Sequence, residues 1–289
     1  MANNIVLAKT YTDLLDQVYK EASVTSDLVS DSTLIRAGAN VNEIVYPQIE
    51  VSGLGDYDRN SGYTDGSVNL VWKTAKFNYD RGTKISVDTM DDEETFDISF
   101  GMAGAELQRT KVAPEADAFT FATLAGLDGI KTVTGTYADA EAFLAALLEA
   151  KNHLDEKEVP EEGRILYATP TLVNGLMALD TNKSREVFNS FRTVKKVPQS
   201  RFYTAIDLKD GKTSGEEAGH FAKAADGKEI NFMIVEKSAV IKWDKHTVSA
   251  VISPDNNPGA DAYISKYRKY GIVDAYANKR AGIYVSHKA

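Results

Sequence analysis

The residue types that most often carry catalysis or bind metals are scattered along this sequence of 289 residues. There is no cysteine, which excludes a disulfide, a thiolate nucleophile and a thiolate metal site. The histidines include no pair four residues apart and no HExxH pattern, which argues against a zinc site; they are His153, His220, His246 and His287. The sequence therefore favours no metal site.

Motifs for phosphate binding and for covalent catalysis are also incomplete. Gly53-Leu54-Gly55 lacks the third glycine of a dinucleotide-binding fingerprint and precedes no helical pattern. No complete phosphate-binding loop of the form GxxxxGK[ST] and no GxSxG motif occurs. Residues 207–211 fail the calcium-loop spacing, which leaves open only a weak, fortuitous site. We therefore expect no cofactor, no catalytic residues and no enzymatic activity.

The acidic run at 91–94 has two interpretations, a catalytic carboxylate cluster or the start of a helix. An apolar stripe with steps of three and four follows it and favours the helix, since acids stabilise the positive end of the helix dipole. The stripe consists of Phe96, Phe100, Ala103, Leu107, Thr110, Pro114, Asp117, Phe121 and Leu124. A helix over 91–124 would be about 50 Å long. Pro114 removes one backbone hydrogen bond and is expected to kink or split it.

Two strand-like segments before this helix, 44–51 and 68–85, predict a long β-hairpin. At about 3.3 Å per residue the return strand would be roughly 60 Å long. The tip at 52–67 is rich in glycine, aspartate and tyrosine, which is typical of a turn. A lone hairpin is marginally stable in water, so this hairpin either folds back on its own domain or is held by another chain.

The return strand also changes the face that it buries. Its apolar residues have one parity up to Trp72 and the other parity from Phe77 onward, so the change falls near Thr74. Successive side chains of a strand point to opposite faces. We therefore expect this strand to pass from one packing surface to another.

The remaining segments predict an α+β fold. Residues 11–22 and 140–154 have amphipathic helical spacing, 164–168 is a short buried strand, and Thr169 and Pro170 mark the start of a further helix. Residues 204–228 are polar and glycine-rich and are expected to form a surface loop. Strand-like runs follow at 230–235, 239–243, 247–253 and from 262 to the end, with a hinge at 254–258.

The formal net charge of −9 is unevenly distributed. Residues 182–201 and 262–289 are both strongly basic, so the rest of the chain carries the acidic excess. This segregation fits pairing of acidic and basic faces between subunits, although charges on solvated surfaces could also be distributed in this way. The acidic total argues against strong nonspecific DNA binding. Neither a signal peptide nor an apolar run of 18 residues occurs, so we expect no membrane association.

The order of these elements, together with the runs 78–82, 87–88 and 273–284, resembles the major capsid proteins of tailed bacteriophages. The resemblance covers essentially the whole chain and implies an N-terminal arm, an extended hairpin loop, a long spine helix in a peripheral domain and an inserted axial α/β domain. The implied boundaries are 1–43 for the arm, 44–86 for the hairpin loop, 87–135 for the peripheral domain with the spine helix, 136–254 for the axial domain and 255–289 for the return to the peripheral domain.

The resemblance implies a structural protein that assembles into pentamers and hexamers of an icosahedral head. Such a shell encloses double-stranded DNA without sequence-specific binding, lies in the virion and is made in the cytoplasm of the bacterial host. Further implied partners are scaffold, portal and decoration proteins. The residues expected at intersubunit contacts are Tyr57, Arg59, Tyr63, Trp72 and Arg81.

Some relatives join subunits by an isopeptide bond between a loop lysine and an asparagine, which is a hypothesis here for Lys73 or Lys76 with Asn278. Two alternatives to the capsid interpretation stay open. One is an encapsulin-type compartment shell, which shares the fold and encloses an enzyme. The other is an unrelated two-domain enzyme, against which the missing catalytic motifs argue.

Overall fold

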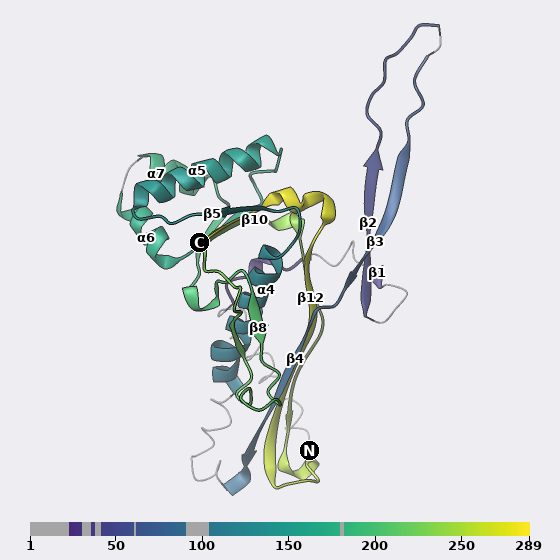
Figure 1. Ribbon diagram of the computed structural model, residues 1–289. Helices are drawn as coiled ribbons and strands as arrows, with labels where there is room; N and C mark the ends of the chain where they lie inside the picture. The colour runs from purple at the N-terminus through teal and green to yellow at the C-terminus, as the bar shows by residue number, and fades with distance from the viewer. Residues whose placement is uncertain (1–22, 31–35, 38–41, 61, 91–103, 180–181) are drawn as a thin grey trace. The chain divides into compact units, whose positions relative to one another are not determined.

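The computed structural model describes residues 23–30, 36–37, 42–60, 62–90, 104–179 and 182–289 (Figure 1). The chain forms two compact units, of which the smaller is 31–78. The helix predicted at 11–22 and the acidic helix start predicted at 91–94 lie outside the described residues. Within the described part of the chain, no helix is both long enough and apolar enough to cross a membrane.

The smaller unit is a β-hairpin. Strand β2 (Glu43–Val51) pairs antiparallel with β3 (Val68–Lys76), from Glu43 opposite Lys76 to Val51 opposite Val68. The short strand β1 (Arg36–Ala37) pairs with the beginning of β2. The predicted hairpin is thus confirmed.

The predicted return strand at 68–85 is divided in two by the structure. β3 ends at Lys76, and β4 (Tyr79–Asp88) lies in a different sheet. The expected passage between two packing surfaces is confirmed, whereas the expected unbroken strand is wrong. Side chains alternate strictly along a continuous strand, so a change of buried face requires an interruption, which Phe77 and Asn78 provide.

A three-stranded antiparallel sheet in the larger unit has the order β11-β12-β4. It combines β4 with β11 (Val240–Ile252) and β12 (Ala262–Ala275). The sequence predicts two strands in place of β11. The structure joins them through an irregularity between Asp244 and His246, where one extra residue is accommodated as in a β-bulge.

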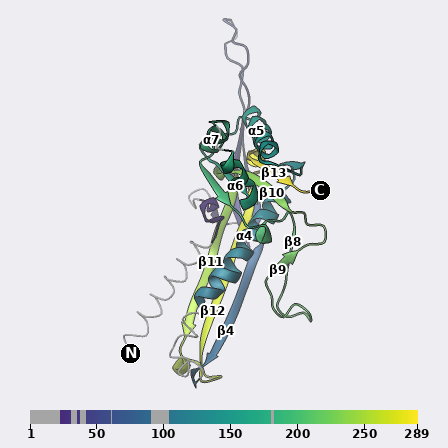
Figure 2. The same cartoon turned by 90° about the vertical axis from the view of Figure 1, so that its left-hand side faces the viewer.

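The described part of the predicted spine helix packs along β12 (Figure 2). It consists of one helical turn at 104–107, the π-helical turn η3 (Gln108–Val112) and α4 (Ala113–Ala125). Pro114 lies in the first turn of α4, directly after the π-helical turn. The helix is not split at this proline, because the backbone stays helical from 104 to 125, and a kink stays a prediction. The π-helical turn lies directly before Pro114, which has no N–H to continue the preceding hydrogen-bond pattern.

A mixed five-stranded sheet has the order β5-β13-β10-β6-β7. Its members are β5 (Lys131–Thr134), β6 (Arg164–Ala168), β7 (Thr193–Lys196), β10 (Ile230–Glu236) and β13 (Ile283–His287). On one face Leu166, Phe232 and Ile234 pack beneath three helices, which are α5 (Ala140–Glu156), α6 (Pro170–Ala178) and α7 (Asn182–Asn189) (Figure 1). On the other face Tyr167 and Met233 pack with Phe121 of α4. Burial on both faces explains the uninterrupted apolar runs of β6 and β10.

The five-stranded sheet takes strands from both sides of the expected boundaries near 135 and 255, and these boundaries stay predictions. The boundaries place β5 and β13 in the peripheral domain, but both strands lie in the sheet that contains β6, β7 and β10. β13 is buried over most of its length, and its place between β5 and β10 covers it on both edges. Residues 204–228 also differ from a plain loop, since β8 (Ile206–Leu208) and β9 (Phe221–Lys223) pair there.

Candidate assembly surface and its anchors

One face of the hairpin consists of apolar cross-strand pairs. Val51 lies opposite Val68, Ile49 opposite Leu70, and Pro47 opposite Trp72, so these side chains share one face. Ile49 is 60% exposed, Leu70 51% and Trp72 45%. Beyond the buried Ile44, Tyr46 and Ala75, the opposite face carries four polar residues and the exposed Val71; the polar residues are Gln48, Glu50, Asn69 and Lys73. The hairpin is thus a two-sided ribbon with an uncovered apolar side, which we call the apolar ribbon face.

Large exposed apolar side chains are concentrated in this unit. Nine of the thirteen such side chains in the described part of the chain lie between Ile49 and Trp72. A contiguous exposed apolar surface usually marks an interaction site, whereas scattered exposed residues are ordinary. The hairpin is therefore the strongest candidate for a contact with another molecule.

The hairpin tip presents aromatic and charged residues. The rings of Tyr57 and Tyr63 lie 4.8 Å apart, and Tyr63 is 88% exposed. Asp58 and Gly62 exchange backbone hydrogen bonds, and the φ of +82° at Gly62 explains the glycine there. Arg59, between them in this turn, is exposed. The tip is a locally bonded turn that displays an aromatic pair and a cation.

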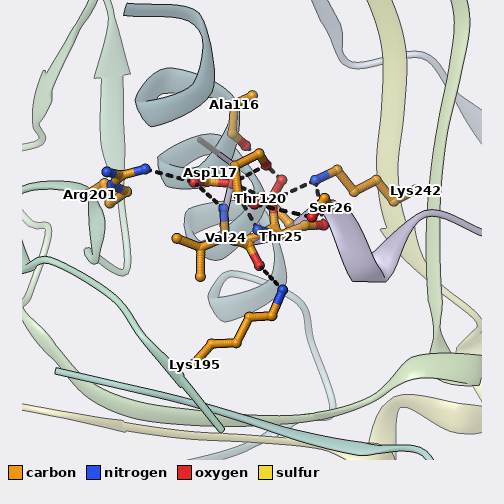
Figure 3. Close-up of polar contacts among 10 residues, drawn as sticks. Val24, Thr25, Ser26, Ala116, Asp117, Thr120, Lys195, Arg201 and Lys242 are labelled. Atoms are coloured by element: carbon orange, nitrogen blue, oxygen red, sulfur yellow. Dashed lines mark hydrogen bonds and ion pairs between the residues drawn. The ribbon is translucent and has the colours of Figure 1, made fainter. Parts of the chain in front are cut away.

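The chain before the hairpin unit is fastened to the buried carboxylate of Asp117 on α4 (Figure 3). The hydroxyls of Ser23 and Thr25 donate to Oδ1 at 2.8 and 2.6 Å. The backbone N–H of Val24 donates to Oδ2 at 2.9 Å and that of Thr25 to Oδ1 at 3.1 Å. Arg201 adds an ion pair at 3.0 Å. Five donors thus satisfy a carboxylate that has no access to water.

Lys242 of β11 holds the same segment from the other side. Its Nζ donates to the hydroxyl of Thr25 at 2.6 Å and to the carbonyl of Thr25 at 3.1 Å (Figure 3). Ser30 pairs with the same strand, since its N–H donates to the Lys242 carbonyl at 2.9 Å and its hydroxyl to the Val240 carbonyl at 2.7 Å. Between these contacts Leu28 is fully buried in the core. Residues 23–30 are therefore an integral part of the larger unit.

The chain after the hairpin unit is fastened to a second buried carboxylate of α4. Glu115 accepts from Arg81 Nε at 2.7 Å and from the Tyr79 hydroxyl at 3.2 Å. The His220 ring lies 3.6 Å from the same carboxylate, beyond ordinary hydrogen-bond length. Burial acts to raise the pKa of Glu115, but His220 and Arg81 outweigh it and leave this pKa below its ordinary value. Glu115 is therefore held as a carboxylate.

The loop between β8 and β9 reaches this site through His220. The N–H of Lys209 donates to the His220 carbonyl at 2.9 Å, and Arg81 donates to the same carbonyl at 3.3 Å. The loop contains Gly211-Lys212-Thr213, the last three residues of a phosphate-loop pattern, but the pattern's first glycine is absent and no helix follows. Within the described residues, no group of three or more acidic or histidine side chains could hold a metal ion.

The structure distributes the five expected contact residues over three places. Tyr57, Arg59 and Tyr63 gather at the tip, and Trp72 lies on the apolar ribbon face. Arg81 lies in the larger unit, where its guanidinium is bonded to Glu115 of the same chain. All five stay predictions as intersubunit contacts, and Arg81 has an intrachain role in addition.

The anchors were not predicted from the sequence. Asp117 occupies a position in the apolar stripe of the helix, and Lys242 lies in an apolar strand. A charged residue at a position of the apolar pattern is the signal that could have identified them, because buried charges are rare unless they are paired. The basic segment 182–201 also has an intrachain use, since Lys195 pairs with Asp27 at 2.6 Å and Arg201 with Asp117.

Burial lowers the pKa of Lys242 from 10.5 to about 8, and the neighbouring Lys269 acts in the same direction. Between these two values the unfolded chain binds more protons at this residue than the folded chain does. The contribution of Lys242 to the free energy of unfolding therefore rises with pH between about 8 and 10.5. We expect chemical denaturation from pH 7 to 10.5 to show a smaller rise for Lys242→Met than for the unaltered chain. Parallel curves would contradict this assignment.

No family model matches the sequence, and no curated protein matches it. Solved structures do match the fold. A chain from Mycobacterium phage Che8 is 14% identical with a TM-score of 0.57, and the match covers 91% of this chain and 90% of that one.

Two further structures extend this similarity. The capsid structure of the cyanophage P-SCSP1u gives 13% identity and a TM-score of 0.56, over 93% of this chain and 88% of that one. A virus-like particle from Pyrococcus furiosus gives 11% identity and a TM-score of 0.60, over 97% and 99%. The chain therefore has the fold of tailed-phage capsid proteins, as its sequence resemblance implied.

Proposed function

We propose that this chain is a shell-forming major capsid protein of a tailed bacteriophage, with a structural and not an enzymatic role. The observation that carries the proposal is the uncovered apolar ribbon face, on a hairpin whose length and position fit the hairpin loop of the family. Similarity to phage capsid structures over about nine tenths of the chain supports it. In this proposal a neighbouring copy covers the ribbon.

The assembled form is proposed to consist of pentamers and hexamers in the wall of an icosahedral head that encloses double-stranded DNA. Many repeated contacts between copies would close the shell. The acidic net charge of −9 fits a wall that encloses DNA without binding it tightly. Scaffold, portal and decoration proteins are the further proposed partners. The proposed location is the virion, after synthesis in the host cytoplasm.

The test is to express the full chain and examine it by size-exclusion chromatography and negative-stain electron microscopy. Closed shells, sheets or tubes are the expected products. If the chain remains monomeric, limited proteolysis shows whether the hairpin is exposed or already protected. A hairpin that is cleaved readily still fits an arm that awaits a neighbour, whereas a hairpin that resists protease in the monomer would overturn the proposal.

A compartment shell with a different content is the second candidate. It is favoured by the similarity to the virus-like particle from Pyrococcus furiosus, which covers 97% of this chain. The long hairpin argues for the phage head. Particles purified from the native source would contain DNA in the first case and a protein cargo in the second, and nuclease digestion with gel electrophoresis distinguishes these contents.

At the hairpin tip, Arg59→Glu is expected to lower particle yield without changing the fold. Arg59 is exposed, so its replacement should change the free energy of unfolding by no more than about 0.5 kcal/mol. Particle yield is measured by sedimentation and monomer stability by urea denaturation. Unchanged particle formation would count against the tip as an intersubunit contact.

The covalent cross-link between subunits is a separate proposal. Lys73, Lys76 and Asn278 are all exposed, which an isopeptide bond between copies requires. Particles boiled in denaturant would then give a ladder of bands on a gel. Migration as a single monomer band would exclude the cross-link and leave the shell proposal intact.

A further inference from the structure

Helix α4 carries two buried carboxylates only two residues apart, and each is bonded to a different stretch of chain. Glu115 is 7% exposed and Asp117 is fully buried. The stretches that they hold, 23–30 and 79–81, are those that lead into and out of the hairpin unit at 31–78. The stretches 23–30 and 79–81, which we call the two roots of the hairpin unit, are thus both bonded to one turn of α4, while Ser30 at the end of the first root is bonded to β11.

The two carboxylates do not compete for the same partners. Residues two apart on an α-helix are separated by about 200° around its axis, so their side chains leave in nearly opposite directions. Asp117 is bonded to Ser23, Val24, Thr25 and Arg201, whereas Glu115 is bonded to Tyr79 and Arg81. These bonds give the two carboxylates no partner in common, so either root can open while the other stays bonded.

The two anchors also differ in strength. Asp117 is fully buried and accepts from two backbone N–H groups, two hydroxyls and a guanidinium. The side chains of Arg81 and His220 at the other anchor are 23% and 25% exposed, against 19% for Arg201, whereas Ser23 and Thr25 are buried. Solvent competes for exposed donors, so the bonds of Glu115 open more easily.

We propose that α4 is a double anchor that sets both roots of the hairpin unit, and that the root at Tyr79 and Arg81 is the one that opens. The chain then stays fastened at 23–30 while 79–81 is released from Glu115. This inference rests on the proposed function, because it treats the hairpin as the assembly arm. It adds that assembly depends on carboxylates in the spine helix, far along the sequence from the contact surface.

The test is hydrogen exchange of the full chain read by mass spectrometry, together with particle yield. Asp117→Asn, and the milder Ser23→Ala, are expected to raise exchange of the Val24 and Thr25 amides about tenfold or more. The start of β4 should keep its wild-type exchange in these variants. Glu115→Gln, and the milder Tyr79→Phe, should raise exchange at 79–81 and 209–220 and leave 23–30 unchanged.

The matched control is Glu106→Gln, which removes an exposed ion pair with Arg109 at 2.8 Å on the same helix. It should change neither exchange pattern nor particle yield, whereas the anchor variants should reduce yield several-fold. In the unaltered chain, exchange at 79–81 should be faster than at 23–25. Three results would overturn the inference. The Asp117 and Glu115 variants could raise exchange in the same segments, or 23–25 could exchange faster than 79–81 in the unaltered chain. The third is a particle yield equal to that of Glu106→Gln in variants whose roots exchange faster.

Failure of the inference and failure of the proposed function are distinguishable. Normal shells from the unaltered chain with no effect of the anchor variants would reject the anchor role alone. If the unaltered chain forms no shells under any condition and resists protease in its hairpin, the shell function is rejected. The exchange pattern would then still decide whether each carboxylate holds its own root.

Discussion

Leu70→Asp is expected to abolish shell formation while the isolated chain stays folded. Leu70 lies in the middle of the apolar ribbon face, opposite Ile49, and is 51% exposed in the single chain. A neighbour that covers this face would bury the new carboxylate without a partner, which costs several kcal/mol at each contact. Since a shell repeats the contact in every subunit, we expect particle yield to fall at least tenfold.

The matched control is Asn69→Asp, which introduces the same charge on the opposite face of the same strand. Asn69 pairs with Glu50 on the polar side and is exposed. Both variants should unfold within about 0.5 kcal/mol of the unaltered chain in urea, because surface substitutions have small effects on stability. Equal losses of particle yield would show that charge alone matters, and normal yield from Leu70→Asp would reject the ribbon face as a contact.

The hairpin could be predicted from the sequence because its information is local. Alternation of side chains along 44–51 and 68–76 reports directly on a strand with two different faces. The change in parity of the apolar residues near Thr74 also predicted the passage into a second sheet. What the pattern did not contain was the interruption at Phe77 and Asn78, since residues at a break have no periodicity of their own.

Membership of the five-stranded sheet could not be predicted in the same way. β13 lies between β5 and β10, and the residues that it meets in β5 are about 150 positions away in the sequence. An apolar strand of five residues fits several sheets equally well by pattern alone. Only the packing of the whole unit selects one position, so the place of β13 in this sheet could not be predicted from its pattern.

The anchor residues show the same limit at the scale of single side chains. Asp117 interrupts an apolar stripe, which is a local sign of a buried charge that needs partners. Its partners, Ser23 and Thr25, lie 94 and 92 positions earlier, in a segment with little apolar periodicity. The sequence could have identified the charge, but only the fold could identify what satisfies it.

Asp117→Ala is expected to destabilise the larger unit by about 3–5 kcal/mol, because it removes a buried carboxylate and leaves its donors unpaired. The hydroxyls of Ser23 and Thr25, two backbone N–H groups and the Arg201 guanidinium would lose their acceptor. Lys242, which is bonded to Thr25, would also lose a favourable negative charge in its surroundings. Urea denaturation should show a lower midpoint at an unchanged slope.

Glu106→Gln is the matched control for this loss, since it also neutralises an acid on the same helix. The side chains of Glu106 and Arg109 are 56% and 62% exposed, and such pairs contribute about 0–1 kcal/mol. A comparable loss in both variants would mean that the helix, and not the buried acceptor, is the source of the effect. Asp117→Asn separates charge from shape further. It keeps the size of the side chain and one acceptor oxygen but cannot satisfy all five donors, so we expect a stability between those of Asp117→Ala and the unaltered chain.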